Sequence, residues 1–267
     1  MAMGKGFFTQ TVVILFEGAV NLDVIRKILQ PSYTIIGENQ SSEHWQFGGP
    51  SLTVAYRPDV NGLVNVDVVN QMWPDHMGDS KIDAMLFGAW SLGHFGPFTY
   101  PNALARAVQQ SWRWADATSK VGAHDSFVRI RASYVFGAPN DAPVRPEHYD
   151  GVDELVFVTG LARHVLQLPG AICYFNPNGE VVLPSEVFED TLDFNRRNGL
   201  PAIDAWSNIR LFDVAGDWLA MDMVGSWQFD RPDQEAVFPK NRFSPQEVDR
   251  FLRNAALYII DKGRSSP

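Results

Sequence analysis

The pattern of hydrophobic and polar positions predicts several buried strands and helices in this chain. Thr11–Phe16 and Ala171–Phe175 are short, almost wholly apolar runs, which predicts two buried strands. Residues 126–136 alternate between apolar and polar, which predicts a half-buried strand. A long apolar helix is predicted from Val152 up to Pro169, directly before the second buried strand. A helix that leads into a buried strand is typical of a layered α/β domain.

Shorter apolar or alternating runs predict the remaining strands, and shorter segments with helical periodicity predict the remaining helices. Two pairs of strands are each joined by turn residues, which predicts antiparallel pairing. We therefore expect an α/β fold of the α+β type: a mixed, largely antiparallel sheet with helices on one face, with two ferredoxin-like halves as one arrangement. The further predicted strands are 33–36, 51–56, 63–69, 82–87, 209–214 and 218–224, and the further predicted helices are 21–29, one that begins near Pro101, 185–195 and one that begins after Ser244.

Turn-forming residues are scattered along the chain and do not mark a linker. The 17 prolines and 21 glycines punctuate the periodic segments, and low-complexity tracts are absent from the sequence. We therefore expect a single globular unit over residues 8–262. A division into two similar halves, 8–95 and 96–262, remains open, although no repeat is visible between them at the level of residues.

The charge balance of the chain disfavours two classes of partner. Lys and Arg total 22 against 31 Asp and Glu, a formal net charge of -9. Such a field repels phosphate backbones and anionic lipid headgroups. We therefore expect no nucleic-acid partner and no membrane partner, and a protein partner is the class that this balance leaves open.

The N-terminal apolar run and the cysteine count favour a cytoplasmic location. Glu17 ends the run that begins at Thr11, before a signal-peptide core or a membrane span is complete. Cys173 is the only cysteine, so no internal disulfide can form. It lies within the second buried strand, where we expect it to be a core residue and not a nucleophile.

The second half of the chain carries a set of residues found together in one bacterial family. They are a helix with paired tryptophans, a histidine before a strand, an apolar helix that leads to Gly-Ala and an aromatic strand, and an apolar terminal helix. On these residues, segment 100–262 resembles the uncharacterised bacterial domain-of-unknown-function family numbered 4261. No activity is established for that family, so the resemblance supports the fold more than a function. The matching residues are 107–114, His124, 170–175 and 254–259.

The loop 88–98 has the most unusual local composition, because glycines alternate with aromatic residues. Trp90 and His94 offer stacking surface there, and Arg129 or Arg131 could supply a charged anchor for an anionic or aromatic ligand. The alternatives are a structural aromatic cluster in the loop and ordinary surface ion pairing by the two arginines. The loop contains neither a dinucleotide fingerprint nor a phosphate-binding lysine motif, so we expect no cofactor.

Two further groups of polar residues resemble metal sites only superficially. His124-Asp125 is a dipeptide known from metal-dependent phosphohydrolases, but the other histidines show no ligand spacing. We therefore expect no metal and assign His124 a hydrogen bond at the start of a strand. Helix 185–195 would line four carboxylates along one side, which we interpret as a solvated acidic face, with a patch for a basic partner as the alternative. These carboxylates are Glu186, Glu189, Asp190 and Asp193.

The sequence shows packing signals throughout and no catalytic motif, so no catalytic residue can be named. The first hypothesis is a non-catalytic cytoplasmic protein-interaction or accessory domain. The alternative is a small-molecule-binding protein or an enzyme, with its pocket at the aromatic, glycine-rich loop 88–98. The oligomeric state does not follow from the pattern.

The best-marked helix start gives a first prediction. Ser244 precedes Pro245 and stands three residues before Glu247, which is the arrangement of a capping box. Ser244→Ala removes the side-chain oxygen that caps a backbone N–H, so we expect it to lower the free energy of unfolding by about 0.5 to 2 kcal/mol. Urea unfolding measures this difference. An unchanged midpoint would show that the helix does not begin there.

Overall fold

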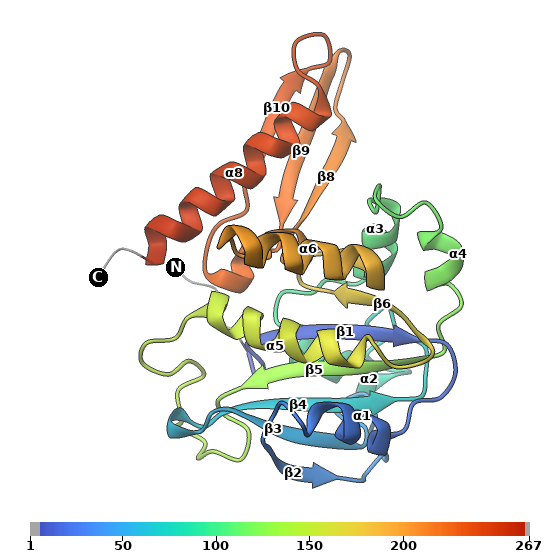
Figure 1. Ribbon diagram of the computed structural model, residues 1–267. Coiled ribbons are helices and arrows are strands. Elements are labelled where there is room, and N and C mark those ends of the chain that lie inside the picture. Colours follow the sequence, from blue (N-terminus) through green and yellow to red (C-terminus); the bar gives the residue numbers. More distant parts are fainter. Residues whose placement is uncertain (1–5, 265–267) are drawn as a thin grey trace.

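An antiparallel seven-stranded sheet forms the centre of the protein in the computed structural model, which describes residues 6–264 (Figure 1). Each strand runs antiparallel to its neighbours. The α/β prediction of a largely antiparallel sheet is therefore confirmed. Across the sheet the strands are β2 (Ile35–Asn39), β3 (Ser51–Arg57), β4 (Gly62–Val69), β5 (Ser126–Ser133), β1 (Gln10–Phe16), β6 (Ala171–Asn176) and β7 (Val181–Pro184), with the 3-10 helix η1 (Pro58–Val60) between β3 and β4.

Three helices cover one face of this sheet: α1 (Leu22–Leu29), α5 (Gly151–Val165) and α6 (Ser185–Asn198) (Figure 1). The α5 helix begins where the side chain of Asp150 accepts hydrogen bonds from the first backbone N–H groups. Its residues Leu155, Val158 and Val165 are fully buried against the sheet. The expected helix layer is thus present.

The other face of the sheet is also covered. Three short helices, α2 (Ala84–Ser91), α3 (Ala103–Gln109) and α4 (Ala117–Val121), pack there around a second apolar cluster. Trp73 and Phe127 meet edge to face at the centre of this cluster. Because both faces are covered, every residue of β1 is buried.

Two local predictions were wrong. Residues 82–87 are not a strand, because Asp83 caps helix α2 through a hydrogen bond from the N–H of Leu86, and Ile82 is 88% exposed. A short apolar run fits a strand and a helix equally well, so the cap decided. Strand β5 is not half-buried, because all of its residues are buried, Arg129 and Arg131 included.

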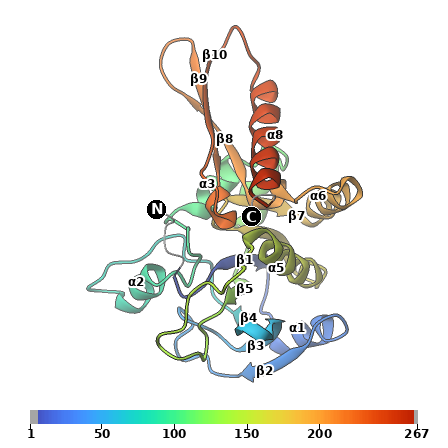
Figure 2. The ribbon, with the colours of Figure 1, turned by 90° about the vertical axis from the view of Figure 1, so that its left-hand side faces the viewer.

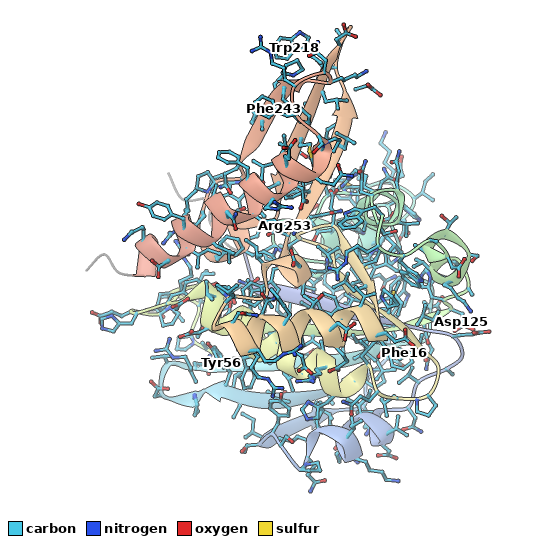
Figure 3. All side chains as sticks on the ribbon, turned by 45° about the horizontal axis from the view of Figure 1, so that its top comes forward. Phe16, Tyr56, Asp125, Trp218, Phe243 and Arg253 are labelled. Carbon is cyan, nitrogen blue, oxygen red and sulfur yellow. The ribbon has the colours of Figure 1, made fainter. Side chains whose placement is uncertain are left out.

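A second, smaller sheet with one helix projects from the body that the seven-stranded sheet and its helices form (Figures 1 and 2). We call this projection the arm. Its tip carries Trp218 and Phe243, far from the body (Figure 3). The hairpin of the arm matches the prediction, whereas its third strand was missed because it is only five residues long. The arm comprises β8 (Asn208–Asp213), β9 (Trp218–Val224), β10 (Glu235–Pro239) and α8 (Pro245–Arg264).

The last helix begins as predicted. The backbone N–H of Ser244 donates to the Glu247 carboxylate at 2.8 Å, and the N–H of Glu247 donates back to the Ser244 hydroxyl at 3.3 Å. Phe251 is apolar but 65% exposed, so it does not belong to the buried stripe of this helix. The residues that α8 buries against β9 and β10 recur every fourth position, and Phe251 lies about 100° around the helix from them. They are Val248, Leu252, Ala256 and Ile260.

Gln228 joins the arm to the body. It belongs to the 3-10 helix η2 (Ser226–Phe229), and its Nε2 donates at 2.7 Å to the carbonyl of Trp206, the last residue of helix α7 (Ile203–Trp206). Its Oε1 accepts a hydrogen bond from Asn176 at 2.8 Å. At Gly179 a Cβ would lie 1.8 Å from the same Trp206 oxygen, so only glycine fits. Apolar residues of the arm and of the body also belong to one buried cluster.

Within residues 6–264, no helix combines the length and the apolar character that a membrane span requires.

Burial of the single thiol gives a second prediction. Cys173 lies in β6 with no exposed surface, as expected, and burial raises the pKa of its thiol. We expect the native protein to resist a thiol reagent at neutral pH, and the unfolded protein to react with one equivalent. Absorbance of the released chromophore measures both states. Rapid labelling before unfolding would contradict the core position.

Candidate functional site

The two arginines of β5 form a buried ion-pair network with Asp67 of β4. Arg129 Nη2 lies 2.7 Å from one carboxylate oxygen of Asp67, and Arg131 Nη2 lies 2.8 Å from the other. All three residues are at most 2% exposed. The interpretation of surface ion pairing is therefore wrong for Arg129 and Arg131. Buried charges are tolerated when they are paired and hydrogen-bonded. Each charged group of this network has an ion-pair partner, and Nε of Arg131 is the one guanidinium nitrogen of the network that lacks a hydrogen-bond partner among the described residues.

The same network holds the chain segment before β3. Arg129 donates to the carbonyls of Trp45 and Gln46 at 2.7 and 3.0 Å, and Asp67 accepts a hydrogen bond from the N–H of Gly49. Burial alone would raise the pKa of Asp67, but the two guanidinium groups outweigh it and hold this pKa below its ordinary value. The carboxylate stays ionised and binds the segment to the sheet.

His94 and Trp90 lie on the same side of the sheet as this network. Nδ1 of His94 is 2.8 Å from the carbonyl oxygen of Phe47 and 3.1 Å from Arg131 Nη1. Trp90 is 7% exposed and stacks on Phe95 with a centroid distance of 5.0 Å. The structure thus brings His94 and Arg131 into contact. The four residues predicted to bind a ligand, Trp90, His94, Arg129 and Arg131, all contact other groups of the protein. Ligand binding by these residues stays a prediction.

His124 makes hydrogen bonds at the start of β5, as expected. Its Nε2 accepts from the N–H of Trp73 at 3.0 Å, and its Nδ1 lies 2.6 Å from the carbonyl of Val121. Asp125 accepts a hydrogen bond from the N–H of Gly18 at 2.7 Å. These contacts fix the entry to the strand. Over residues 6–264 the structure shows no group of three His, Cys, Asp or Glu residues that could hold a metal ion.

The acidic side of α6 is partly neutralised by a neighbouring helix. Arg163 of α5 donates to Glu189 at 2.7 Å and to Asp193 at 3.3 Å. Asp193 also pairs with Arg196 at 3.2 Å. Glu189 and Asp193 therefore join α6 to α5, while Glu186 and Asp190 are exposed, so the interpretation of a solvated acidic face holds for these two carboxylates.

A groove with a volume of about 950 Å³ lies between the body and the arm. The lining residues come from the loop between α3 and α4, which we call one wall, from α8, the second wall, from β8 and β9, the floor, and from the end of α6 with α7, the base. This volume falls at the upper end of the range for binding sites. Its lining includes Gln110, Trp112 and Thr118, Phe194, Leu200, Ile203 and Asp204, Ile209, Leu211 and Met221, and Asp249, Arg250, Arg253 and Leu257.

The apolar side chains at the rim of the groove are unusually exposed. Trp112 is 73% exposed and Phe194 is 55% exposed, while Leu200 and Leu211 are 38% and 39% exposed. Scattered apolar residues are normal on a protein surface, but a group of them around one concavity marks a binding surface. The groove is therefore the candidate functional site.

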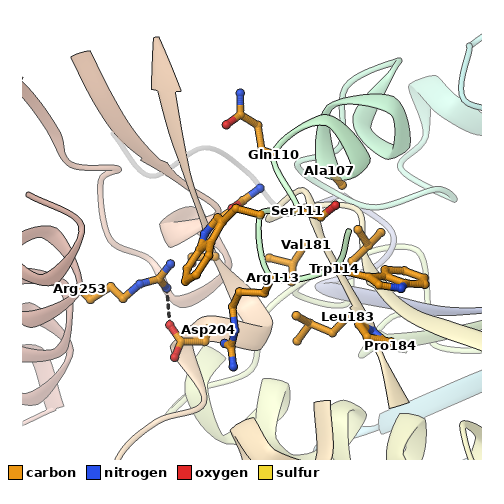
Figure 4. A pocket seen from close by; sticks show the side chains of 14 residues that line it. Ala107, Gln110, Ser111, Arg113, Trp114, Val181, Leu183, Pro184, Asp204 and Arg253 are labelled. Atoms are coloured by element: carbon orange, nitrogen blue, oxygen red, sulfur yellow. Dashed lines mark hydrogen bonds and ion pairs between the residues drawn. The ribbon is translucent and has the colours of Figure 1, made fainter. Parts of the chain in front are cut away.

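A side pocket of about 40 Å³ opens beneath the α3–α4 loop, next to the groove (Figure 4). Among its lining residues Arg253 of α8 pairs with Asp204 of α7 (Figure 4), and the Nε of Arg253 lies 3.1 Å from Asp249 on the same helix. The Arg253–Asp204 pair fixes the α8 wall of the groove to its base. The lining of the groove and the side pocket that the structure describes holds no histidine or cysteine.

A buried glutamate fixes the opposite wall. Glu180, 4% exposed, receives Arg106 of α3 at 2.6 Å and Arg210 of β8 at 3.1 Å. It thereby ties a helix of the body to the edge strand of the arm. Gln110 extends the contact, because its Oε1 accepts a hydrogen bond from the N–H of Leu211 at 3.4 Å.

The sequence pattern did not reveal this groove, because its lining comes from segments that are distant along the chain. The paired tryptophans Trp112 and Trp114 are the one signal in the sequence, and the structure places both after the end of α3 and not within a helix. Exposure of a tryptophan is visible only once the fold is known.

Comparisons with models of protein families, with curated proteins and with solved structures found no match for this chain. The resemblance of residues 100–262 to the bacterial family therefore stays a prediction.

His94 gives a prediction of pH dependence. Burial, together with the charges of Arg131 and Arg129, lowers the pKa of His94 from 6.5 to about 3. Between pH 6.5 and about pH 5 the unfolded chain therefore takes up a proton there that the folded protein does not. We expect the free energy of unfolding to fall as the pH falls, by up to about 1.4 kcal/mol per pH unit from this residue.

Urea unfolding at several pH values in that window measures the slope. His94→Gln should remove this contribution, while His148→Gln, which changes a side chain that is 86% exposed, should leave the slope unchanged. Equal slopes for the protein and its His94→Gln variant would contradict the prediction.

Proposed function

We propose that this protein is a non-catalytic interaction module that binds a segment of another protein in the groove between body and arm. The observation that carries the proposal is the open groove of about 950 Å³, with Trp112 and Phe194 exposed at its rim. Tryptophan and other aromatic residues are enriched where interfaces gain most of their binding energy.

The polar groups around the groove support binding and not catalysis. Asp204 and Asp249 both pair with Arg253, so these carboxylates are occupied by a structural cation. A general base would need a partner nucleophile within hydrogen-bond reach. The side chains instead offer apolar surface with a few charges at its margin, as in the rim and core of an interface.

The small-molecule alternative at loop 88–98 has less support from the geometry. Trp90 is buried on Phe95, and His94 is enclosed by Phe8 and Phe47 at centroid distances of 5.1 and 5.0 Å. A ligand there would have to displace packed aromatic rings. The proposed function therefore rests on the groove.

Site-specific photocrosslinking tests this function. A photoreactive p-benzoylphenylalanine at position 112 would project into the groove, since Trp112 is largely exposed. In the native host, we expect irradiation to give a discrete adduct with another protein, because the bound segment would lie within contact distance of this side chain. Gel electrophoresis and mass spectrometry of the adduct provide the measurement.

The matched control places the same photoreactive residue at Phe251. Phe251 lies on α8 and is exposed, as Trp112 is, but it does not line the groove. Melting temperatures of both variants establish that each is folded. The absence of an adduct at position 112, or the same adducts at both positions, would rule out the groove as the binding site.

A further inference from the structure

We infer that the occupant of the groove is an amphipathic helix with acidic flanks, contributed by a partner protein and lying beside α8. This inference rests on the proposed function and adds the chemistry of the partner. Three independent observations carry it: the kind of surface at the floor, the length of the α8 wall, and the charges around the groove.

The floor of the groove consists of side chains on the face of a sheet. Ile209, Leu211 and Met221 lie on the side of β8 and β9 that faces α8. The helix packs on β9 and β10 and leaves the β8 side beside it open, where Leu211 is 39% exposed. An apolar sheet face beside a helix is covered by another helix in layered folds. A bound strand would instead need the outer backbone edge of β8, where the N–H of Leu211 already donates to Gln110.

The α8 wall has the dimensions of a short helix–helix contact. The residues of α8 that line the groove run from Pro245 to Leu257 and recur at spacings of three and four, so they form one side of the helix. Twelve steps along a helix span about 18 Å. A partner helix of roughly three turns would match this wall, with apolar residues at positions i, i+3, i+4 and i+7.

The charges around the groove differ in sign from those of the protein as a whole. The groove and its side pocket are lined by three arginines and two aspartates, an excess of one positive charge, whereas the chain carries -9. Arg253 is neutralised by both aspartates. Arg250 lies on the α8 wall of the groove, and Arg113 lines the side pocket next to it. Among the side chains that the structure describes, neither has a hydrogen bond or ion-pair partner within 4 Å.

The carboxylate one turn before Arg250 on α8 is already engaged. Glu247 accepts hydrogen bonds from the backbone and the hydroxyl of Ser244, which lower its pKa, and the charge of Arg250 adds to this effect. Arg113 and Arg250 therefore keep their hydrogen-bond donors for a ligand. Acidic side chains on both flanks of a partner helix would complement the two arginines. The same arginines would disfavour basic partners, which the net negative charge of the whole protein otherwise attracts.

A selection experiment tests the inference on the whole protein. Random peptides of about 16 residues, long enough for four helical turns, are displayed on phage and selected on the protein, with removal of those that also bind Trp112→Ala. We expect the enriched sequences to carry apolar residues at helical spacing, Asp or Glu between them, and no internal proline. Circular dichroism should show that the tightest peptide gains helix on binding.

Variants at the charged positions then test the flanks. Arg250→Glu should weaken the selected peptide by about fivefold at low salt, and the difference should shrink as salt rises. Phe251→Ala, outside the groove, should not change the affinity. Enriched peptides with alternating apolar and polar residues, with internal prolines or with basic residues would overturn the inference of an acidic amphipathic helix. They would leave the proposed function intact. Failure to enrich any peptide that depends on Trp112 would also overturn the inference, and an absent crosslink at position 112 would separately overturn the function.

Discussion

The groove depends on one buried carboxylate, Glu180, which lies between the arginines of two different parts of the molecule. Arg106 comes from a helix of the body and Arg210 from the edge strand of the arm, and both contact the same side chain. Without this carboxylate Arg106 would lose its ion-pair partner, whereas Arg210 would keep Asp222, so Glu180 ties the α3 side of the groove to β8 in its floor. Gln228 and the close approach at Gly179 fix the base of the arm in the same way. A rigid frame lowers the entropic cost of binding, and this is the physical basis of the groove as a site.

A second buried network shows why residues with catalytic potential are used for structure in this fold. The central sheet is covered on both faces, so polar side chains on its inner strands must find partners within the protein. Arg129 and Arg131 therefore close on Asp67 and on backbone carbonyls, and His94 stays next to them as a neutral ring. The strongest chemical groups lie in the interior, while the open concavity is lined mainly by apolar and amide side chains.

Local signals predicted most of the elements correctly. The capping box at the start of α8, the buried strands at the centre of the sheet and the hairpin of the arm all follow from residues that are near each other in sequence. The errors lie where local signals are ambiguous. Residues 82–87 fit a strand by hydrophobicity but form a helix because of an aspartate cap, and β10 is a short edge strand that ends in a proline.

The sequence by itself determined the periodic elements, their caps and the acidic character of the protein, because each of these depends on composition or on neighbours within one or two turns. Only the tertiary structure decided which side chains are buried and which line a site. Asp67 and Arg129 are 62 positions apart, and Arg106 and Glu180 are 74 apart. Alternation along β5 places the arginines on one face of a strand, but it cannot show that the α2 and α3 segments cover that face. The groove likewise exists only because the arm projects from the body, and that arrangement is set by contacts between residues far apart in the chain.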